Sequence, residues 1–167
     1  MRSRCCRPFR EADLDPDVRL LDKGFSPGKA LGLFAKAHPE AGGIASFVGK
    51  VRPDDLVQVL KLSHYEPLTL PGMRALAAQT AGRWPLDGLL IHHRVGYMRP
   101  GAPIVLVAAA ARHRRAAIEA VDFAMDHLKS DAWFWKREKR GGTWHWIEPR
   151  AEDHADLARW SEATGRD

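Results

Sequence analysis

Runs of apolar residues along the chain predict its strands. PIVLVAAAAR at 103–112 is apolar throughout, which is typical of a strand covered on both faces. GGIASFVGKVR at 42–52 also indicates a buried strand rather than an alternating one, and LVQVLKLSHY at 56–65 has high β-propensity. A further strand is expected at 86–98, where alternation places four residues on one face: Leu89, Ile91, His93 and Val95.

Helices are expected where apolar residues recur every three or four positions. Ser26 and the proline after it mark the start of a short helix over 26–38. Pro71 opens a second helix, which runs to Trp84. The clearest helix spans 114–129, and its apolar stripe consists of Ile118, Val121, Met125 and Leu128.

The end of the chain completes an α+β pattern. WHWIEPR at 144–150 predicts a short strand, the glycine pair before it a hairpin turn, and EDHADLARW at 152–160 a terminal helix. Strands and helices alternate irregularly, without repeats. We therefore expect a single α+β domain over 17–167, with a mixed or antiparallel sheet flanked by helices, after a flexible leader at 1–16.

Composition narrows the class of protein. With 167 residues, 28% of them charged and 45% hydrophobic, the chain can bury a core without metals or disulfides. No run approaches the length of a membrane span, and the basic N-terminus lacks the apolar centre of a secretory signal, so a cytoplasmic protein is expected. The only cysteines, Cys5 and Cys6, are adjacent, and two alone cannot build a tetrahedral zinc site.

The net charge of +5 favours an anionic partner. A nucleic acid, a phosphorylated small molecule and an acidic protein would all satisfy it. The position of the basic residues is more informative than their number.

Basic residues stand at the ends of predicted elements. His113, Arg114 and Arg115 follow a buried strand and begin a helix, where free backbone N–H groups favour an anion. A solvated basic turn is the alternative, but it leaves the choice of residues unexplained. In SFVGKVR, Lys50 and Arg52 close another strand after a glycine that permits close backbone approach. These two could equally be ordinary exposed charges.

The stretch HLKSDAWFWKREKR at 127–140 places Lys129 and Lys136 beside bulky aromatic residues. Ser130-Asp131 predicts a helix end there, followed by an aromatic-lined loop or strand. A lysine against apolar walls loses solvation, which lowers its pKa and makes it a better nucleophile or proton donor. Alternatively, the aliphatic stems cover tryptophan while the ammonium groups stay in water. Glu138 could pair with either lysine.

His92 and His93 are not expected to share a metal. Neighbouring strand residues point to opposite faces, and no cysteine or carboxylate cluster accompanies the two histidines. We expect a core or strand-edge role for them and no metal site.

Five motifs in order resemble the large, catalytic subunit of molybdopterin synthase, over about residues 18–160. They are FVGKVR (47–52), HHRVGYMRPG (92–101), RHRRAAIEA (112–120), MDHLK followed by FWKRE (125–138), and WIEPR (146–150). Each motif is weak alone, but together they have the order and spacing of that family. The resemblance implies an α/β-hammerhead-like fold.

The resemblance also implies an activity and partners. In that family the large subunit inserts two sulfurs into a cyclic pyranopterin monophosphate (precursor Z), which yields molybdopterin for the molybdenum cofactor. The sulfur arrives as a thiocarboxylate on the C-terminal Gly-Gly tail of a small ubiquitin-like subunit. A homodimer of large subunits, with one small subunit at each end, makes a heterotetramer. No metal or cofactor is implied for this step.

Site residues follow from the resemblance position by position. It implies Lys129 and Lys136 as catalytic residues, without saying which lysine does which task. The implied substrate-binding set is Lys50, Val51, Arg52, His113, Arg114, Lys129, Lys136, Arg137 and Glu138. Arg52 and Arg114 would hold the phosphate and the incoming carboxylate tail. Ala132 stands near where the family commonly has proline, so the loop into the site is expected to differ.

Two other functions are compatible with parts of the sequence. A small basic nucleic-acid-binding domain would use the net charge and the six tryptophans, but the basic residues form no stripe and no RNA-binding signature is present. A non-catalytic scaffold of the same pathway would not need Lys129 and Lys136.

Overall fold

The computed structural model describes residues 14–53, 56–130, 133–148 and 151–162. Across these residues, eight strands form two four-stranded sheets with four helices around them. In chain order the elements are β1 (Asp17–Leu21), α1 (Pro27–Ala37), β2 (Gly43–Lys50), β3 (Val57–His64), α2 (Glu66–Arg83), β4 (Leu86–Arg94), β5 (Gly96–Met98), β6 (Pro103–Ala111), α3 (Arg114–Ser130), β7 (Phe134–Arg140), β8 (Thr143–Ile147) and α4 (Ala151–Glu162). No helix in these ranges is long and apolar enough to cross a membrane.

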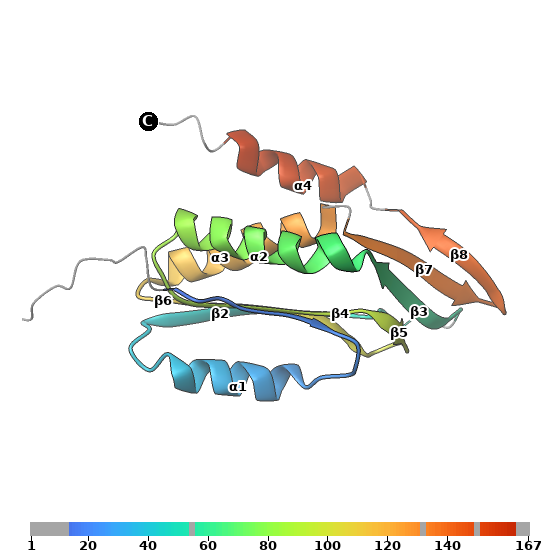
Figure 1. Cartoon of the computed structure of the whole chain (residues 1–167), viewed down its shortest axis with the longest axis horizontal. Coiled ribbons are helices and arrows are strands. Elements are labelled where there is room, and N and C mark those ends of the chain that lie inside the picture. The colour runs from blue at the N-terminus through green and yellow to red at the C-terminus, as the bar shows by residue number, and fades with distance from the viewer. Residues whose placement is uncertain (1–13, 54–55, 131–132, 149–150, 163–167) are drawn as a thin grey trace, which may run out of the picture.

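Sheet A is the middle layer of the molecule (Figure 1). Its strand order is β1-β4-β6-β2, with β1 parallel to β4 and the other pairs antiparallel. Helix α1 lies on one face, α2 and α3 cover the other, and α4 lies outside α3. The predicted mixed sheet flanked by helices is confirmed.

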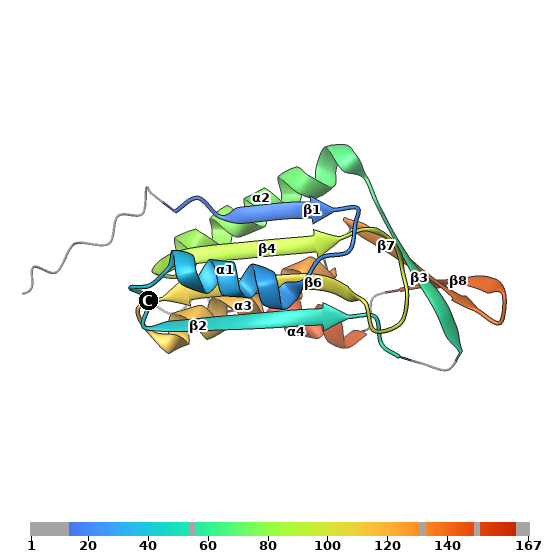
Figure 2. The same ribbon diagram turned by 90° about the horizontal axis from the view of Figure 1, so that it is seen from below.

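Sheet B is smaller, antiparallel, and lies at one end of sheet A (Figure 2). Its order is β5-β3-β7-β8. One face packs on a small apolar cluster, which consists of Val51, Leu60, Leu62, Val95 and Met98. This cluster joins the end of β2 to strand β3, so the two sheets meet where the motifs FVGKVR and HHRVGYMRPG come together.

Strand β6 is buried on both faces, as its apolar sequence predicts, whereas the prediction of a buried strand at 42–52 is wrong. Strand β2 forms an edge of sheet A, and Phe47 and Val48 remain 41% and 39% exposed. Apolar composition alone cannot distinguish a central strand from an edge strand, because both can carry β-branched and aromatic side chains.

Two predicted boundaries move. Helix α2 begins at Glu66 rather than at Pro71, because Tyr65 accepts backbone hydrogen bonds from Leu68 and Thr69 and closes an extra first turn. The strand predicted at 86–98 divides into β4 and β5, since Gly96 has a φ of 85° that breaks the extended backbone.

Two further details differ from the predicted pattern. In α3, Val121, Met125 and Leu128 of the predicted stripe are buried, whereas Ile118 is 53% exposed. Strand β1 has no counterpart among the predicted strands, although Val18 and Leu20 alternate in it and pack against the core.

Helix α4 is fastened to α3 through one carboxylate. Asp126 is buried, and its Oδ2 accepts hydrogen bonds from Arg159 at 2.6 Å and from the indole N–H of Trp160 at 2.8 Å. The Trp160 ring also packs edge-on against Phe123 and Trp84, with centroids 5.3 and 5.9 Å apart. The predicted terminal helix therefore belongs to the packed structure.

Candidate active site

The basic residues predicted for the site lie at opposite ends of β2. Arg114 begins α3 beside Gly43, the first residue of β2, since a side chain on that glycine would contact the Arg114 backbone. Lys50 closes the same strand. At about 3.3 Å per residue, the eight residues of β2 separate these ends by about 23 Å. Within one copy of the chain, His113 and Arg114 therefore do not join Lys50 and Arg52.

Helix α3 brings Lys129 back to the Lys50 end. Its 17 residues rise about 1.5 Å each, so the helix spans about the length of β2 and lies along it. The chain then turns into β7, where Lys136 pairs with Leu62 of β3. Leu62 belongs to the same buried cluster as Val51. Lys129, Lys136 and the Lys50-Val51-Arg52 segment are thus gathered at one end of the molecule.

Backbone hydrogen bonds fix the Val51 segment. The Val51 N–H donates to the carbonyl of Ala102 at 2.9 Å, and Gly101 donates to the carbonyl of Val51 at 2.8 Å. Gly49, just before, lies so close to Val105 that an added Cβ would stand 2.7 Å from its methyl group. The glycine therefore admits the Val105 side chain in this structure, and the predicted close approach of a ligand to its backbone stays a prediction.

His93 is a member of this group that the sequence did not reveal. It is the last residue but one of β4 and lies on the α2–α3 face, and its ring stacks on Phe134 of β7 with centroids 4.1 Å apart and planes 13° from parallel. The ring is buried, and the Lys136 ammonium lies near enough to act on it. Burial above all, assisted by Lys136, lowers the pKa of His93 to about 4.

Sequence reasoning correctly separated His92 from His93 but gave neither a site role. The alternation of side chains along the strand could have indicated the position of His93. It places His93 on the same face as Leu89 and Ile91, which pack under α2 and α3. What could not be seen was Phe134, which arrives from a strand 41 residues later.

The predicted substrate-binding residues in β7 do not all point the same way. Lys136 and Glu138 share one face of the strand, whereas Arg137 faces away and lies over Trp144 and Trp146, 4.8 and 5.8 Å from their ring centres. Glu138 accepts a hydrogen bond from Arg140 at 2.7 Å. The structure therefore places Arg137 on the outer surface of sheet B.

Trp133, just before β7, packs against α2. The Thr69 hydroxyl lies 2.9 Å from the carbonyl of Tyr65 and 3.2 Å from that of Trp133, and the Trp133 indole lies directly on Gly72. Ala132, where a departure from the family was expected, lies outside the described residues. Trp133 and Phe134 precede Lys136 in the chain, but Lys129 and Lys136 are both exposed, so the predicted loss of solvation by these lysines is wrong.

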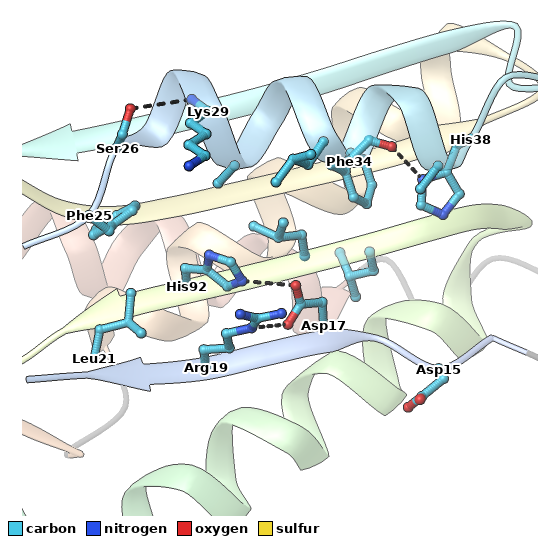
Figure 3. A pocket seen from close by; sticks show the side chains of 15 residues that line it. Asp15, Asp17, Arg19, Leu21, Phe25, Ser26, Lys29, Phe34, His38 and His92 are labelled. Atoms are coloured by element: carbon cyan, nitrogen blue, oxygen red, sulfur yellow. Dashed lines mark hydrogen bonds and ion pairs between the residues drawn. The ribbon is translucent and has the colours of Figure 1, made fainter.

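His92 lies on the opposite face of sheet A and lines a separate cavity of about 460 Å³ between α1 and strands β1 and β4 (Figure 3). Its Nε2 is 3.0 Å from Asp17, which also accepts from Arg19 at 2.6 Å. Burial pulls the pKa of Asp17 upward, but these hydrogen bonds outweigh it and hold the pKa below its usual value. None of the predicted site residues lines this cavity.

Comparison with known proteins decides the family. A sequence model of the family described as "MoaE protein" matches residues 21–131, more than half of the chain. The chain belongs to the MoaE family. The comparisons support the resemblance to molybdopterin synthase and not the alternative of a nucleic-acid-binding domain.

Curated MoaE-family relatives cover nearly the whole chain. The molybdopterin synthase catalytic subunit of Mesorhizobium japonicum is 38% identical over 92% of this chain and 98% of its own. That of Caulobacter vibrioides is 40% identical over 87% and 97%.

Solved structures share the fold. The MoaE protein of Burkholderia ambifaria superposes with a TM-score of 0.75 at 37% identity, covering 88% of this chain and 99% of that one. A complex of subunits 1 and 2 of the molybdopterin-converting factor of Helicobacter pylori contains a chain with a TM-score of 0.69, covering 80% of this chain and 91% of that one. At 19% identity, this second likeness concerns the fold alone.

Proposed function

We propose that this chain is the catalytic subunit of a molybdopterin synthase, a sulfurtransferase that acts in molybdenum cofactor biosynthesis. It would convert the cyclic pyranopterin monophosphate to molybdopterin with sulfur from a thiocarboxylated small subunit. The observation that carries this proposal is the gathering of Lys129, Lys136 and the Lys50-Val51-Arg52 segment at one end of the fold. The names of the curated relatives support the same activity.

The chemistry fits this arrangement. Lys136 or Lys129 assists attack of the thiocarboxylate sulfur, either by polarising the acceptor or by protonating the leaving group. Arg52 holds an anionic group of the substrate or of the small subunit's tail. We expect Trp133 and Phe134 to limit the access of water once substrate is bound, so that the thiocarboxylate transfers its sulfur instead of being hydrolysed.

A homodimer explains why His113 and Arg114 lie so far from the lysines. Strand β2 is an edge of sheet A and exposes Ile44, Phe47 and Val48. If β2 pairs antiparallel with β2 of a second copy about a two-fold axis, the Arg114 end of one copy lies beside the Lys50 end of the other. Each complete site would then combine lysines from one copy with Arg114 of the partner copy.

The outer face of sheet B offers a surface for the small subunit. A cross-strand row runs over all four strands, and it consists of Tyr97, Lys61, Arg137 and Trp146. Lys61 stands over the Tyr97 ring at 5.0 Å, and Trp146 is 66% exposed. Aromatic rings interleaved with cations on an uncovered face suit an acidic protein partner. Arg137 of this row is next to Lys136 in β7, but the Lys136 side chain projects from the opposite face of the strand.

Reconstitution tests the proposal. The purified chain is mixed with a thiocarboxylated small subunit and the cyclic precursor, and the dithiolene product is measured. Wild-type protein should form product, and Lys136→Ala and Lys129→Ala should each lose about a hundredfold in rate, or about 3 kcal/mol of transition-state stabilisation. Lys36→Ala is the matched control, since Lys36 is an exposed lysine in the last turn of α1.

Lys136→Arg separates two roles of the lysine. Arginine keeps the positive charge but has no amine that titrates near neutral pH. Near-normal turnover in Lys136→Arg would make Lys136 an electrostatic anchor, whereas a loss like that of Lys136→Ala would make it a proton donor. Full turnover in both alanine variants would show that the site is elsewhere.

A further inference from the structure

The imidazole of His93 is held in one orientation. Phe134 covers one face of the ring, and Nδ1 lies 3.0 Å from the backbone carbonyl of Arg94. A carbonyl only accepts hydrogen bonds, so Nδ1 carries the proton of the neutral ring. Nε2 is then unprotonated and presents a lone pair.

The hydrogen bond that the structure gives the His93 ring within the described residues is the one at Nδ1, which leaves Nε2 as the atom that can accept. Burial keeps the pKa of His93 at about 4, so the ring is neutral at neutral pH. The charged group that acts on the ring is Lys136, which follows Phe134 by two residues on the same face of β7.

We propose that His93 is a positioning residue for Lys136, whose ammonium donates a hydrogen bond to the unprotonated Nε2 when substrate is bound. The proposal rests on the function proposed for the Lys136 site. The stacked ring fixes the acceptor, and the acceptor fixes the direction of the ammonium group. Accepting a hydrogen bond also favours the charged form of the lysine, so that it keeps the proton needed by a leaving group.

A neutral histidine suits this task better than a charged or carboxylate side chain. A carboxylate would bind the ammonium as an ion pair and compete with the anionic substrate. A protonated imidazole would repel the ammonium. The buried ring avoids both, because its environment prevents protonation until the pH falls well below neutral.

Two substitutions separate packing from hydrogen bonding. His93→Phe keeps a flat ring against Phe134 but has no acceptor, whereas His93→Gln loses the ring but places an amide oxygen near the position of Nε2. In the reconstituted enzyme, His93→Phe should lower kcat roughly tenfold or more with little change in KM, the effect of one hydrogen bond to a charged group. His93→Gln should restore much of kcat, and the outcome that overturns the proposal is a kcat equal to wild type in His93→Phe.

A second measurement needs no turnover. With the cyclic precursor bound and the small subunit absent, the rate at which acetic anhydride acylates Lys136, followed by peptide mass mapping against pH, reports the apparent pKa of the amine. The Lys136 profile should move to lower pH in His93→Phe and return in His93→Gln, while Lys36 stays unchanged in all three proteins. An unmoved Lys136 profile overturns the role of His93. Absence of dithiolene product with wild-type protein would instead overturn the proposed function.

A third measurement covers a His93→Phe protein that does not fold. In wild type and in Lys136→Met, the His93 ring is titrated by NMR. Removing a neighbouring positive charge should raise the pKa of His93. An identical titration in both proteins would show that the two side chains do not interact, and the proposal would fail.

Discussion

The buried ring of His93 makes the stability of the fold depend on pH. An unfolded histidine has a pKa of about 6.5, whereas the folded ring has a pKa of about 4. Above the unfolded value the ring is neutral in both states. As the pH falls between the two values, only the unfolded chain takes up the proton, so the free energy of unfolding decreases.

The size of this effect can be measured. Between about pH 7 and about pH 4.5, His93 should account for a loss of roughly 2.4 kcal/mol in the free energy of unfolding. Urea unfolding of wild type and His93→Phe at both pH values gives the contribution by difference, because the other titrating groups are common to both. Equal losses in the two proteins would contradict a buried neutral ring.

The family pattern predicts Lys129 and Lys136 as catalytic residues. The structure brings them to one end of the fold, and their catalytic role stays a prediction. His93 was not predictable as a site residue, because its role depends on Phe134 from a distant strand. Arg137 was predicted for the site, although alternation along β7 turns its side chain to the outer face.

At the scale of elements, α2 offers a test of how the loop before β7 is seated. Gly72 supports the Trp133 indole, and a Cβ there would stand 2.6 Å from the ring. Gly72→Ala should therefore destabilise the protein by about 1–3 kcal/mol through overpacking. Gly82 lies in the same helix with nothing within 4 Å, and Gly82→Ala should stabilise by about 0.5–1 kcal/mol. Urea unfolding distinguishes the two signs, and equal effects would contradict the contact.

The free energy that holds α4 against α3 has a hydrogen-bond part and a packing part, and two substitutions of Trp160 separate them. Trp160→Phe removes the indole N–H from Asp126 but keeps an aromatic ring, and should cost about 1 kcal/mol. Trp160→Ala also removes the contacts with Phe123 and Trp84 and should cost about 3 kcal/mol. The measurement is the free energy of unfolding in urea. A smaller loss in the alanine variant than in the phenylalanine variant would contradict this division.

Helices and strands were predictable where the hydrophobic period and the length of the segment both fit one kind of element. The apolar run of β6 identified it as a buried strand, and the apolar stripe of α3 identified it as a helix, each near its observed position. Strand β1 was missed because five residues are too short for a period to emerge, and it is defined by its pairing with β4. The exposure of β2 was missed because strand order in a sheet depends on contacts between distant segments.

At the scale of the whole molecule, the exposed edge of β2 predicts how the chain associates. Val48→Lys should weaken a homodimer at least about tenfold, since a lysine on an edge strand opposes pairing with another edge. Leu68→Lys is the control, because Leu68 is also an exposed apolar residue (62% against 39% for Val48) and lies on α2, which packs at the β1 side of sheet A. Analytical ultracentrifugation at micromolar concentration measures both. A wild-type monomer, or equal weakening by both variants, would contradict pairing through β2.

The distance between Arg114 and the lysines, fixed by the length of β2, has a genetic consequence. If each working centre draws on both copies, Arg114→Ala and Lys136→Ala homodimers are inactive for different reasons. A mixed dimer places both defects in one centre and leaves the other centre intact. Random mixing makes half of the dimers mixed, so about a quarter of wild-type activity should return. Two alleles that each abolish cofactor synthesis would then complement one another in the same cell, and two alleles damaged at the same end of β2 would not.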